Sequence, residues 1–195
     1  MRRPEVPELA EITPRRGNAF SRWAGAWALS VLGWSFEGAI PEVAKAVVIV
    51  APHTSNWDFF VGVAGMFALG LRVEFLGKSS LFFWPLGPVM RWLGGIPVDR
   101  RVSRGVVEVT ARELEARERM ILALAPEGTR GPVSRWRSGF YHIARRAGVP
   151  IVPVSLDYRR RVIRLGGGFE ATGDLEADLG RLRSFFEGVE GKRSK

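Results

Sequence analysis

His53, one of only two histidines in the chain, precedes the carboxylate Asp58 by five residues. A neutral histidine is the side chain best suited to take a proton from an alcohol near pH 7. A carboxylate on the other ring nitrogen fixes the imidazole tautomer and stabilises the imidazolium that forms. The pair therefore has the residue types needed to activate a hydroxyl for attack on an activated acyl group. The alternative is that His53 caps the following helix.

The spacing of this pair limits where it can lie. Residues five apart on a continuous α-helix point about 140° away from each other, so the pair cannot meet on one helix. An apolar run ends at Ala51, Pro52 interrupts it, and residue types that cap helices follow at positions 54–56. We therefore expect His53 in a loop and Asp58 in the first turn of a helix. That loop follows the carboxyl end of a strand, where active sites of α/β sheets form.

A second polar segment, residues 126–131, follows another apolar run. Gly128 lets the backbone turn tightly and present N–H groups, Thr129 adds a hydroxyl and Arg130 adds a bidentate charge. The segment is predicted to hold a phosphate. The alternative is an ordinary polar turn in which Glu127 pairs with Arg130.

Two further cations follow predicted strands. Arg100 closes the segment Gly-Ile-Pro-Val-Asp-Arg at 95–100, and Lys78 follows Phe-Leu-Gly at 75–77. Taken singly, such a charge is more often an ordinary surface residue.

Apolar runs of strand length alternate with segments of helical periodicity, which favours an α/β fold. The prolines in the last predicted strand suggest a sheet edge or a strand end, and residues 191–195 are expected to fray. The predicted strands are 45–51, 73–77, a short one within 94–100, 120–125 and 149–156, and the predicted helices are 59–71, 102–114, 138–146 and 175–186.

We predict a single α/β domain with a central mixed, largely parallel sheet flanked by helices. A chain of 195 residues is long enough to bury a substantial core. Residues 1–40 are expected to form an N-terminal arm and an amphipathic, membrane-docking helix, and residues 41–195 the main domain. The start of the chain does not resemble a cleavable signal peptide, because prolines and glutamates interrupt it.

The N-terminal helix is predicted from the uncharged stretch 23–36, which is too short to span a bilayer. Trp23, Trp27 and Trp34 are spaced four and seven apart, so they would share one helical face. Three arginines within residues 15–22 precede them. Tryptophan with nearby arginine is typical of a helix lying in a membrane interface, and the alternative is a core helix.

The chain is strongly basic, with a net charge of +9, which indicates anionic partners such as a membrane surface, phosphorylated substrates or nucleic acid. No known nucleic-acid-binding motif is visible, so we expect no nucleic acid partner. The absence of cysteine excludes disulfides, thiolate metal sites and a cysteine nucleophile. We expect no metal site, because the second histidine, His142, sits among apolar and arginine residues.

Four segments together resemble the conserved blocks of the glycerolipid acyltransferases. They occur in that family's order and approximate spacing, and they span residues 53–154, about half of the chain. The segments are His-x4-Asp at 53–58, Gly-Ile-Pro-Val-Asp-Arg at 95–100, Pro-Glu-Gly-Thr-Arg at 126–130 and Val-Pro-Ile-Val-Pro-Val at 149–154.

This resemblance implies transfer of a fatty acyl group from acyl-CoA or acyl carrier protein to the hydroxyl of a lysophospholipid. The expected acceptor is 1-acyl-glycerol-3-phosphate, and no cofactor is needed beyond the acyl donor. The resemblance makes His53 the general base and Asp58 its orienting partner. It also implies a protein bound peripherally or monotopically at the cytoplasmic face of the cell membrane, with residues 41–195 as the acyltransferase domain. The residues implied to bind the acceptor are Lys78, Arg100, Glu127, Gly128, Thr129 and Arg130.

The chain departs from the family pattern at two positions. Pro52 stands where the family usually has asparagine, and Ala125 stands where it usually has phenylalanine. Neither change removes a group from the implied chemistry, but both bear on which substrate is bound. Two alternatives therefore stay open: an acyltransferase with another lysolipid or glycolipid acceptor, and a non-catalytic basic protein that binds membranes or nucleic acid.

Overall fold

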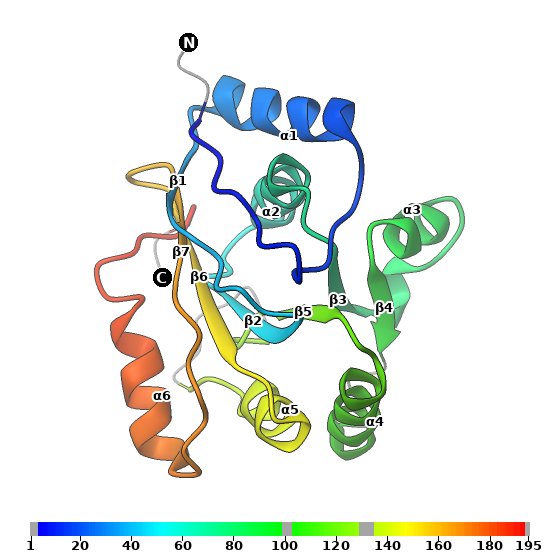
Figure 1. The fold of residues 1–195 in the computed structure, drawn as a ribbon, viewed down its shortest axis with the longest axis vertical. Coiled ribbons are helices and arrows are strands. Elements are labelled where there is room, and N and C mark those ends of the chain that lie inside the picture. Colours follow the sequence, from blue (N-terminus) through cyan, green and yellow to red (C-terminus); the bar gives the residue numbers. More distant parts are fainter. Residues whose placement is uncertain (1–3, 99–102, 129–134, 194–195) are drawn as a thin grey trace.

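The computed structural model describes residues 4–98, 103–128 and 135–193 and shows an α/β fold around one sheet (Figure 1). In chain order the strands are β1 (Ser35–Gly38), β2 (Lys45–Ala51), β3 (Val73–Lys78), β4 (Gly95–Val98), β5 (Met120–Leu124), β6 (Ile151–Asp157) and β7 (Val162–Leu165). Their order across the sheet is β1-β7-β6-β2-β5-β3-β4. Only the β6–β7 pair is antiparallel among the strands described. The predicted mixed, largely parallel sheet is confirmed.

Helices cover both faces of the sheet, so the fold has three layers (Figure 1). One face carries α1 (Ala19–Leu32) and α2 (Trp57–Leu69). The other carries α4 (Ser103–Ala116), α5 (Gly139–Ala147) and α6 (Leu175–Ser184). A shorter helix, α3 (Leu86–Trp92), follows a 3₁₀ turn at Ser79–Leu81 and lies beside β4 at the sheet edge.

The hydrophobic core is divided by the sheet into two clusters. On β2, Val48 packs toward α1 and α2, whereas Val47 and Ile49 pack toward α4, α5 and α6. Successive side chains of a strand point to opposite faces, so a strand buried on both faces must be apolar throughout. This explains why the sequence of β2 is a continuous run of small and β-branched residues.

Of the two alternatives that the prolines suggest for residues 149–156, the sheet edge is wrong, because β6 lies inside the sheet between β7 and β2. The strand-end alternative fits Pro150, because β6 begins at Ile151. Pro153 is tolerated inside the sheet because of its register. Its carbonyl accepts the N–H of Gly166 at 2.8 Å, and Gly166 lies just past the end of β7. The N–H that proline lacks therefore falls where the ladder with β7 already stops.

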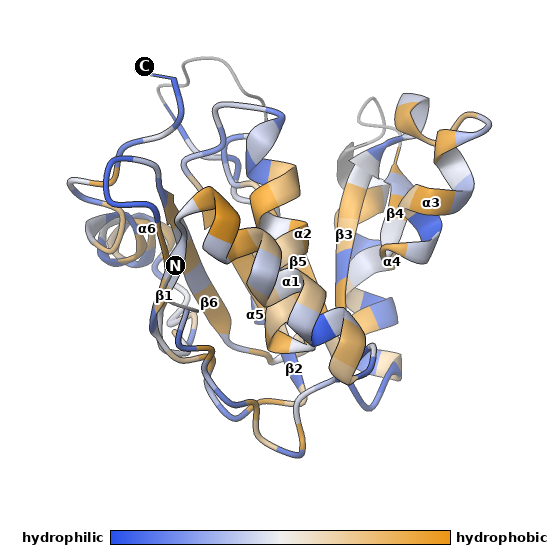
Figure 2. Ribbon diagram, turned by 90° about the horizontal axis from the view of Figure 1, so that it is seen from above, coloured by the Kyte–Doolittle hydropathy of each residue, from blue (hydrophilic) through white to orange (hydrophobic). Residues whose placement is uncertain are grey.

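The N-terminal helix α1 begins and ends four residues before the uncharged stretch 23–36 from which it was predicted. Asn18 caps its start, and Gly33, with a left-handed φ of 73°, caps its end. Trp34 lies beyond the cap and is only 5% exposed, so the prediction that it shares a helical face with Trp23 and Trp27 is wrong. Those two tryptophans are exposed and stack on each other. In the view from above, the colours of α1 are largely those of apolar residues (Figure 2).

Helix α1 packs very closely on α2. A Cβ atom added at Gly25 would lie 2.4 Å from the backbone nitrogen of Ala68 and 2.7 Å from the carbonyl oxygen of Ala64. Only glycine permits this backbone-to-backbone approach. The two helices therefore form one tightly joined layer.

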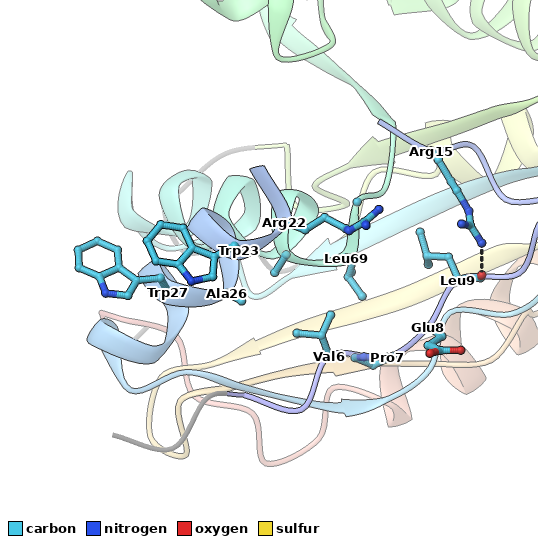
Figure 3. A pocket seen from close by; sticks show the side chains of 12 residues that line it. Val6, Pro7, Glu8, Leu9, Arg15, Arg22, Trp23, Ala26, Trp27 and Leu69 are labelled. Carbon is cyan, nitrogen blue, oxygen red and sulfur yellow. Dashed lines mark hydrogen bonds between the residues drawn. The ribbon is translucent and has the colours of Figure 1, made fainter. Parts of the chain in front are cut away.

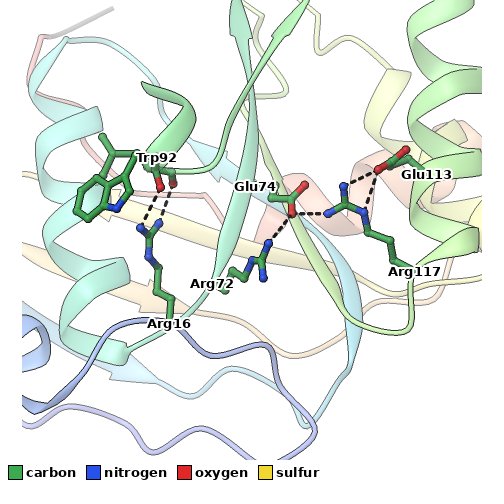
Figure 4. Close-up of polar contacts among 7 residues, drawn as sticks. Arg16, Arg72, Glu74, Trp92, Glu113 and Arg117 are labelled. Atoms are coloured by element: carbon green, nitrogen blue, oxygen red, sulfur yellow. Dashed lines mark hydrogen bonds and ion pairs between the residues drawn. The ribbon is translucent and has the colours of Figure 1, made fainter. Parts of the chain in front are cut away.

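Arginines tie together segments that are distant in the sequence (Figure 4). The guanidinium of Arg16 donates to the backbone carbonyls of Trp92 and Leu93 at 3.0 Å each, which ties the N-terminal segment to α3. Arg117, just after α4, bridges Glu74 on β3 and Glu113 on α4. Arg117 thereby ties strand β3 to α4.

The predicted division at residue 41 falls after β1, which pairs with β7 in the same sheet. Residues before 41 therefore contribute to the main fold. Within the described part of the chain, no helix combines the length and apolar character needed to cross a bilayer.

Candidate active site

The candidate site lies where the parallel strands end. Strands β2, β3, β5 and β6 run in the same direction, so their carboxyl ends meet at one edge of the sheet. His53 follows β2, Lys78 ends β3, Glu127 follows β5 and Tyr158 follows β6. Four segments that are distant in sequence thus deliver polar side chains to the same edge.

The loop between β2 and α2 brings the predicted pair together. β2 ends at Ala51 and α2 begins at Trp57, so His53 lies in the loop and Asp58 in the first helical turn, as the spacing predicts. His53 Nδ1 lies 3.0 Å from Asp58 Oδ2. A carboxylate in the first turn of a helix is also favoured by the helix dipole.

Asp58 is almost fully buried, with 4% of its surface exposed, and it is held by several donors. Its Oδ2 accepts the backbone N–H groups of Thr54 at 2.7 Å and Ser55 at 2.8 Å, in addition to facing His53. Its Oδ1 accepts the hydroxyl of Tyr158 at 2.8 Å. Burial raises the pKa of Asp58, but the hydrogen bonds lower it by more, so the net pKa lies below its usual value. Asp58 is therefore a carboxylate at neutral pH.

His53 is partly accessible, with 23% of its side chain exposed. Because Nδ1 faces Asp58, the ring nitrogen available for base chemistry is Nε2. The backbone N–H of His53 donates to Glu127 Oε2 at 3.2 Å. Side chain and backbone of the histidine are thus held by two different carboxylates.

Glu127 is one of the residues predicted to bind the acceptor, and it is 5% exposed. Its Oε2 contacts the histidine loop, and a buried carboxylate is not a group that attracts phosphate. The contact joins the β5 turn to the β2 loop. A role for Glu127 in acceptor binding stays a prediction.

The described start of the segment after β5, residues 126–128, turns at Gly128. Gly128 has a φ of +66°, a left-handed value that suits glycine, and its N–H donates to the carbonyl of Ala125. The exposed side chain of Arg137 lies against Gly128, so closely that a Cβ there would be 2.7 Å from its Cδ and Nε. Sequence reasoning missed Arg137 because it follows the turn outside the matched block.

The remaining predicted residues are less closely joined to the pair. Lys78 is exposed at the end of β3, two strands from β2, which corresponds to about 10 Å across the sheet. Arg100, Thr129 and Arg130 lie outside the described residues.

The expectation that residues 191–195 fray is wrong for residues 191–193. The backbone N–H of Arg193 donates to the side-chain oxygen of Thr54 at 3.3 Å. The ammonium of Lys192 lies 4.1 Å from the centroid of the Trp57 ring. The C-terminal segment therefore packs directly on the loop and helix that carry the His53–Asp58 pair.

A cavity of about 590 Å³ lies away from this pair (Figure 3). It is lined by the N-terminal segment, by α1 and by the end of α2 at Ala68–Gly70. Asp58 lies at the opposite end of α2, about 16 Å along the helix axis. Among the described residues, no group of three histidine, aspartate or glutamate side chains could hold a metal ion.

Comparison with known families places this geometry in context. The model of the family described as Acyltransferase matches residues 36–157, which contain the His53–Asp58 pair and the turn after β5. The crystal structure of a 1-acyl-sn-glycerophosphate acyltransferase from Thermotoga maritima has a similar fold. Its TM-score is 0.62 at 18% identity, over 90% of this chain and 80% of that chain.

Several curated proteins named 1-acyl-sn-glycerol-3-phosphate acyltransferase are similar in sequence. The Haemophilus influenzae protein is 28% identical over 72% of this chain and 61% of its own length. The human beta form is 33% identical over 65% of this chain and 51% of its own length. The chain thus matches between about a third and three fifths of the length of such relatives, the Brassica napus protein being matched over 32%.

Proposed function

Since this chain belongs to the acyltransferase family, we propose that it transfers a fatty acyl group from an acyl thioester to the hydroxyl of a lysophospholipid. The proposed acceptor is 1-acyl-glycerol-3-phosphate, which gives phosphatidic acid. The observation that carries the proposal is the contact of His53 Nδ1 with buried Asp58 at 3.0 Å, at the carboxyl edge of the sheet. The names of the curated relatives support the choice of acceptor.

In the proposed reaction His53 Nε2 removes the proton of the acceptor hydroxyl as its oxygen attacks the thioester carbonyl. The tetrahedral intermediate then collapses, the carbon–sulfur bond breaks, and the leaving thiolate takes the proton from the imidazolium. Asp58 stabilises the imidazolium through Nδ1 while it exists. The thioester is already activated, so the reaction needs neither a covalent enzyme intermediate nor a cofactor.

The acyl donor is proposed to be acyl-CoA or acyl carrier protein. Both donors are anionic, and a protein with a net charge of +9 attracts such partners over the distance of a few Debye lengths. The same charge favours an anionic lipid surface. No nucleic acid partner is part of this proposal.

The acceptor phosphate is proposed to lie between the turn after β5 and the end of β3. This choice is supported by Gly128, which follows β5, and by Lys78, which ends the neighbouring strand β3. Arg137 adds an exposed guanidinium beside Gly128. Arg100, Thr129 and Arg130 are proposed to complete the phosphate site on the strength of the family resemblance. Replacing Arg130 with alanine should mainly raise the KM for the acceptor.

We further propose that the protein works as a peripheral or monotopic protein at the cytoplasmic face of the cell membrane, with α1 in the lipid interface. Four exposed apolar residues recur at helical spacing along α1: Phe20, Trp23, Trp27 and Val31. Of these, Trp27 is 58% exposed. Exposed aromatic faces of this kind mark interaction surfaces, and tryptophan is favoured in the membrane interface.

Vesicle binding tests this placement. Trp23→Ser combined with Trp27→Ser should weaken co-sedimentation with vesicles that contain anionic lipid. Val109→Ser is the matched control, because Val109 is 66% exposed on α4, on the opposite face of the sheet. Equal weakening in both variants would rule out a specific role for α1.

The reaction is tested by acyl transfer from a radiolabelled acyl thioester to a panel of lysolipid acceptors. Wild type, His53→Ala and the control His142→Ala are compared, because His142 is the second histidine and is exposed on α5. Transfer to lysophosphatidate that disappears only in His53→Ala supports the proposal. Transfer to another acceptor alone would keep the mechanism and change the substrate. Absence of transfer with folded protein would favour a non-catalytic membrane-binding role.

A further inference from the structure

Tyr158 joins strand β6 to the candidate active site. It follows Asp157, the last residue of β6, and β6 is the direct neighbour of β2, which leads into the His53 loop. The hydroxyl of Tyr158 donates to Asp58 Oδ1 at 2.8 Å. No other described contact of the candidate site reaches the Oδ1 atom of this carboxylate.

The two oxygens of Asp58 have different partners. Oδ2 faces His53 Nδ1 and two backbone N–H groups of its own loop, all within five residues along the chain. Oδ1 is held from another strand of the sheet by Tyr158. The last torsion of an aspartate side chain has a broad energy profile, so contacts on one oxygen alone leave the carboxylate plane free to rotate. A donor on the second oxygen fixes that plane.

The ring of Tyr158 is itself well fixed. It packs edge-on against the buried Trp34, with ring centroids 4.9 Å apart and planes at 89°. Its backbone N–H donates to the carbonyl of Glu190 at 2.9 Å, in the C-terminal segment that also contacts Thr54. Burial, together with the bond to Asp58, raises the pKa of the Tyr158 hydroxyl, so it remains a donor at physiological pH.

We propose that Tyr158 is a positioning residue that aligns the Asp58 carboxylate with His53 Nδ1. Tyr158 acts through Asp58 and does not touch substrate. It holds Oδ1 so that a lone pair of Oδ2 points at the imidazole while the proton moves to Nε2. This inference rests on the proposed function, because alignment matters only if His53 acts as a base.

The chain offers a matched control for this assignment. Tyr141 is its only other tyrosine, and its hydroxyl also donates to a buried aspartate, Asp178 Oδ2, at 2.9 Å. That pair joins α5 to α6 on the opposite face of the sheet from Asp58. Tyr158→Phe and Tyr141→Phe each remove one hydroxyl, and Phe keeps the ring and the backbone contacts.

The kinetic test measures kcat and KM in both variants. Tyr158→Phe should lower kcat about tenfold with KM for donor and acceptor unchanged, because the change affects only the alignment of the base. Tyr141→Phe should keep the wild-type kcat. In an Asp58→Ala background, which removes the group that Tyr158 holds, Tyr158→Phe should change kcat less than twofold, because residues that act through one another are not additive. Wild-type kcat in Tyr158→Phe, or the same tenfold loss in the Asp58→Ala background, would overturn the assignment.

A second readout does not depend on acyl transfer. The Nδ1 proton of His53, held by Asp58, is observed by NMR and assigned with His142→Gln, because the chain has only two histidines. Tyr158→Phe should shift and broaden this resonance, and Tyr141→Phe should leave it unchanged. An unchanged resonance in Tyr158→Phe would contradict the positioning role. If wild type acylates no lysophospholipid, the proposed function fails, and the resonance still decides whether Tyr158 orders the pair.

Discussion

Replacing Asp58 with asparagine tests the His53–Asp58 pair with little change in shape. The amide has one oxygen, and three donors meet at the Oδ2 position: Thr54 N–H, Ser55 N–H and His53 Nδ1. Asparagine satisfies all three when its oxygen takes that position and its NH₂ group faces the Tyr158 hydroxyl, which can accept. The histidine tautomer is thereby preserved, and the main loss is the negative charge.

The size of the kinetic effect follows from this geometry. Two unit charges 3.0 Å apart attract by roughly 5 kcal/mol at an effective dielectric constant of about 20. His53 is 23% exposed, so solvent screens part of this attraction, and we retain about 3 kcal/mol for the imidazolium in the transition state. At 1.36 kcal/mol per decade, kcat should fall about 10²- to 10³-fold. The two backbone hydrogen bonds should weaken by about 1 kcal/mol each, so stability falls by about 2 kcal/mol.

The assay compares kcat for acyl transfer and the free energy of unfolding in wild type, Asp58→Asn and Asp58→Ala. Asp58→Ala leaves two buried N–H groups without their acceptor and should be the less stable variant. A folded Asp58→Asn protein whose kcat is within fivefold of wild type would refute the idea that a charged Asp58 supports the base.

The same variant makes a prediction about pH. The pKa of Asp58 is lower in the folded protein than its usual 3.8, because hydrogen bonds to the charged form outweigh the effect of burial. A lowered folded pKa contributes stability above the unfolded pKa, and that contribution disappears as the pH falls through the folded value. The stability difference between wild type and Asp58→Asn should therefore shrink below pH 3.8, as measured by chemical denaturation. A constant difference down to pH 2 would contradict the lowered pKa.

Three further substitutions test other parts of the molecule. His53→Ala should lower kcat by 10²- to 10⁴-fold, as roughly expected for loss of a general base, in single-turnover acyl transfer; a smaller loss would point to another base. Gly25→Ala should destabilise the protein by about 1–3 kcal/mol in urea denaturation, because its Cβ meets the α2 backbone. Gly62→Ala, in open space on α2, should stabilise it by up to about 1 kcal/mol, and equal effects would refute the close packing. Lys78→Ala should raise the KM for a phosphate-bearing acceptor with kcat unchanged, and an unchanged KM would remove Lys78 from the phosphate site.

The sequence predicts best the elements whose structure is determined by residues close together in the chain. The run Lys45–Ala51 is a strand in the structure with the predicted bounds. A strand buried on both faces is apolar along nearly its whole length, so it is easily recognised in the sequence. The loop position of His53 and the helical position of Asp58 follow from a proline and capping residues directly between them. That layout lets the two side chains meet, and the structure shows their contact at 3.0 Å.

Features that depend on distant pairing were missed. β1 and β7 are four residues each, and they are strands because β1 pairs with β7 and β7 also pairs with β6. Trp34 is buried because Gly33 ends α1 before it, which the spacing of the tryptophans does not reveal. Tyr158 carries no local signal of function. Its place beside Asp58 follows from the pairing of β6 with β2, because this pairing brings together the segments that follow the two strands.

The close approach of Gly25 to the backbone of α2 fixes the position of α1 relative to α2. Helix α1, which presents the exposed tryptophans, packs directly against the backbone of α2, whose first turn carries Asp58. Neither can slide along the other without a backbone clash. For a protein resting on a bilayer through α1, as proposed, this packing would fix the height of His53 above the lipid plane. Acceptor hydroxyls at that height would reach the proposed base, so helix packing far from the reacting atoms would contribute to the selection among acceptors.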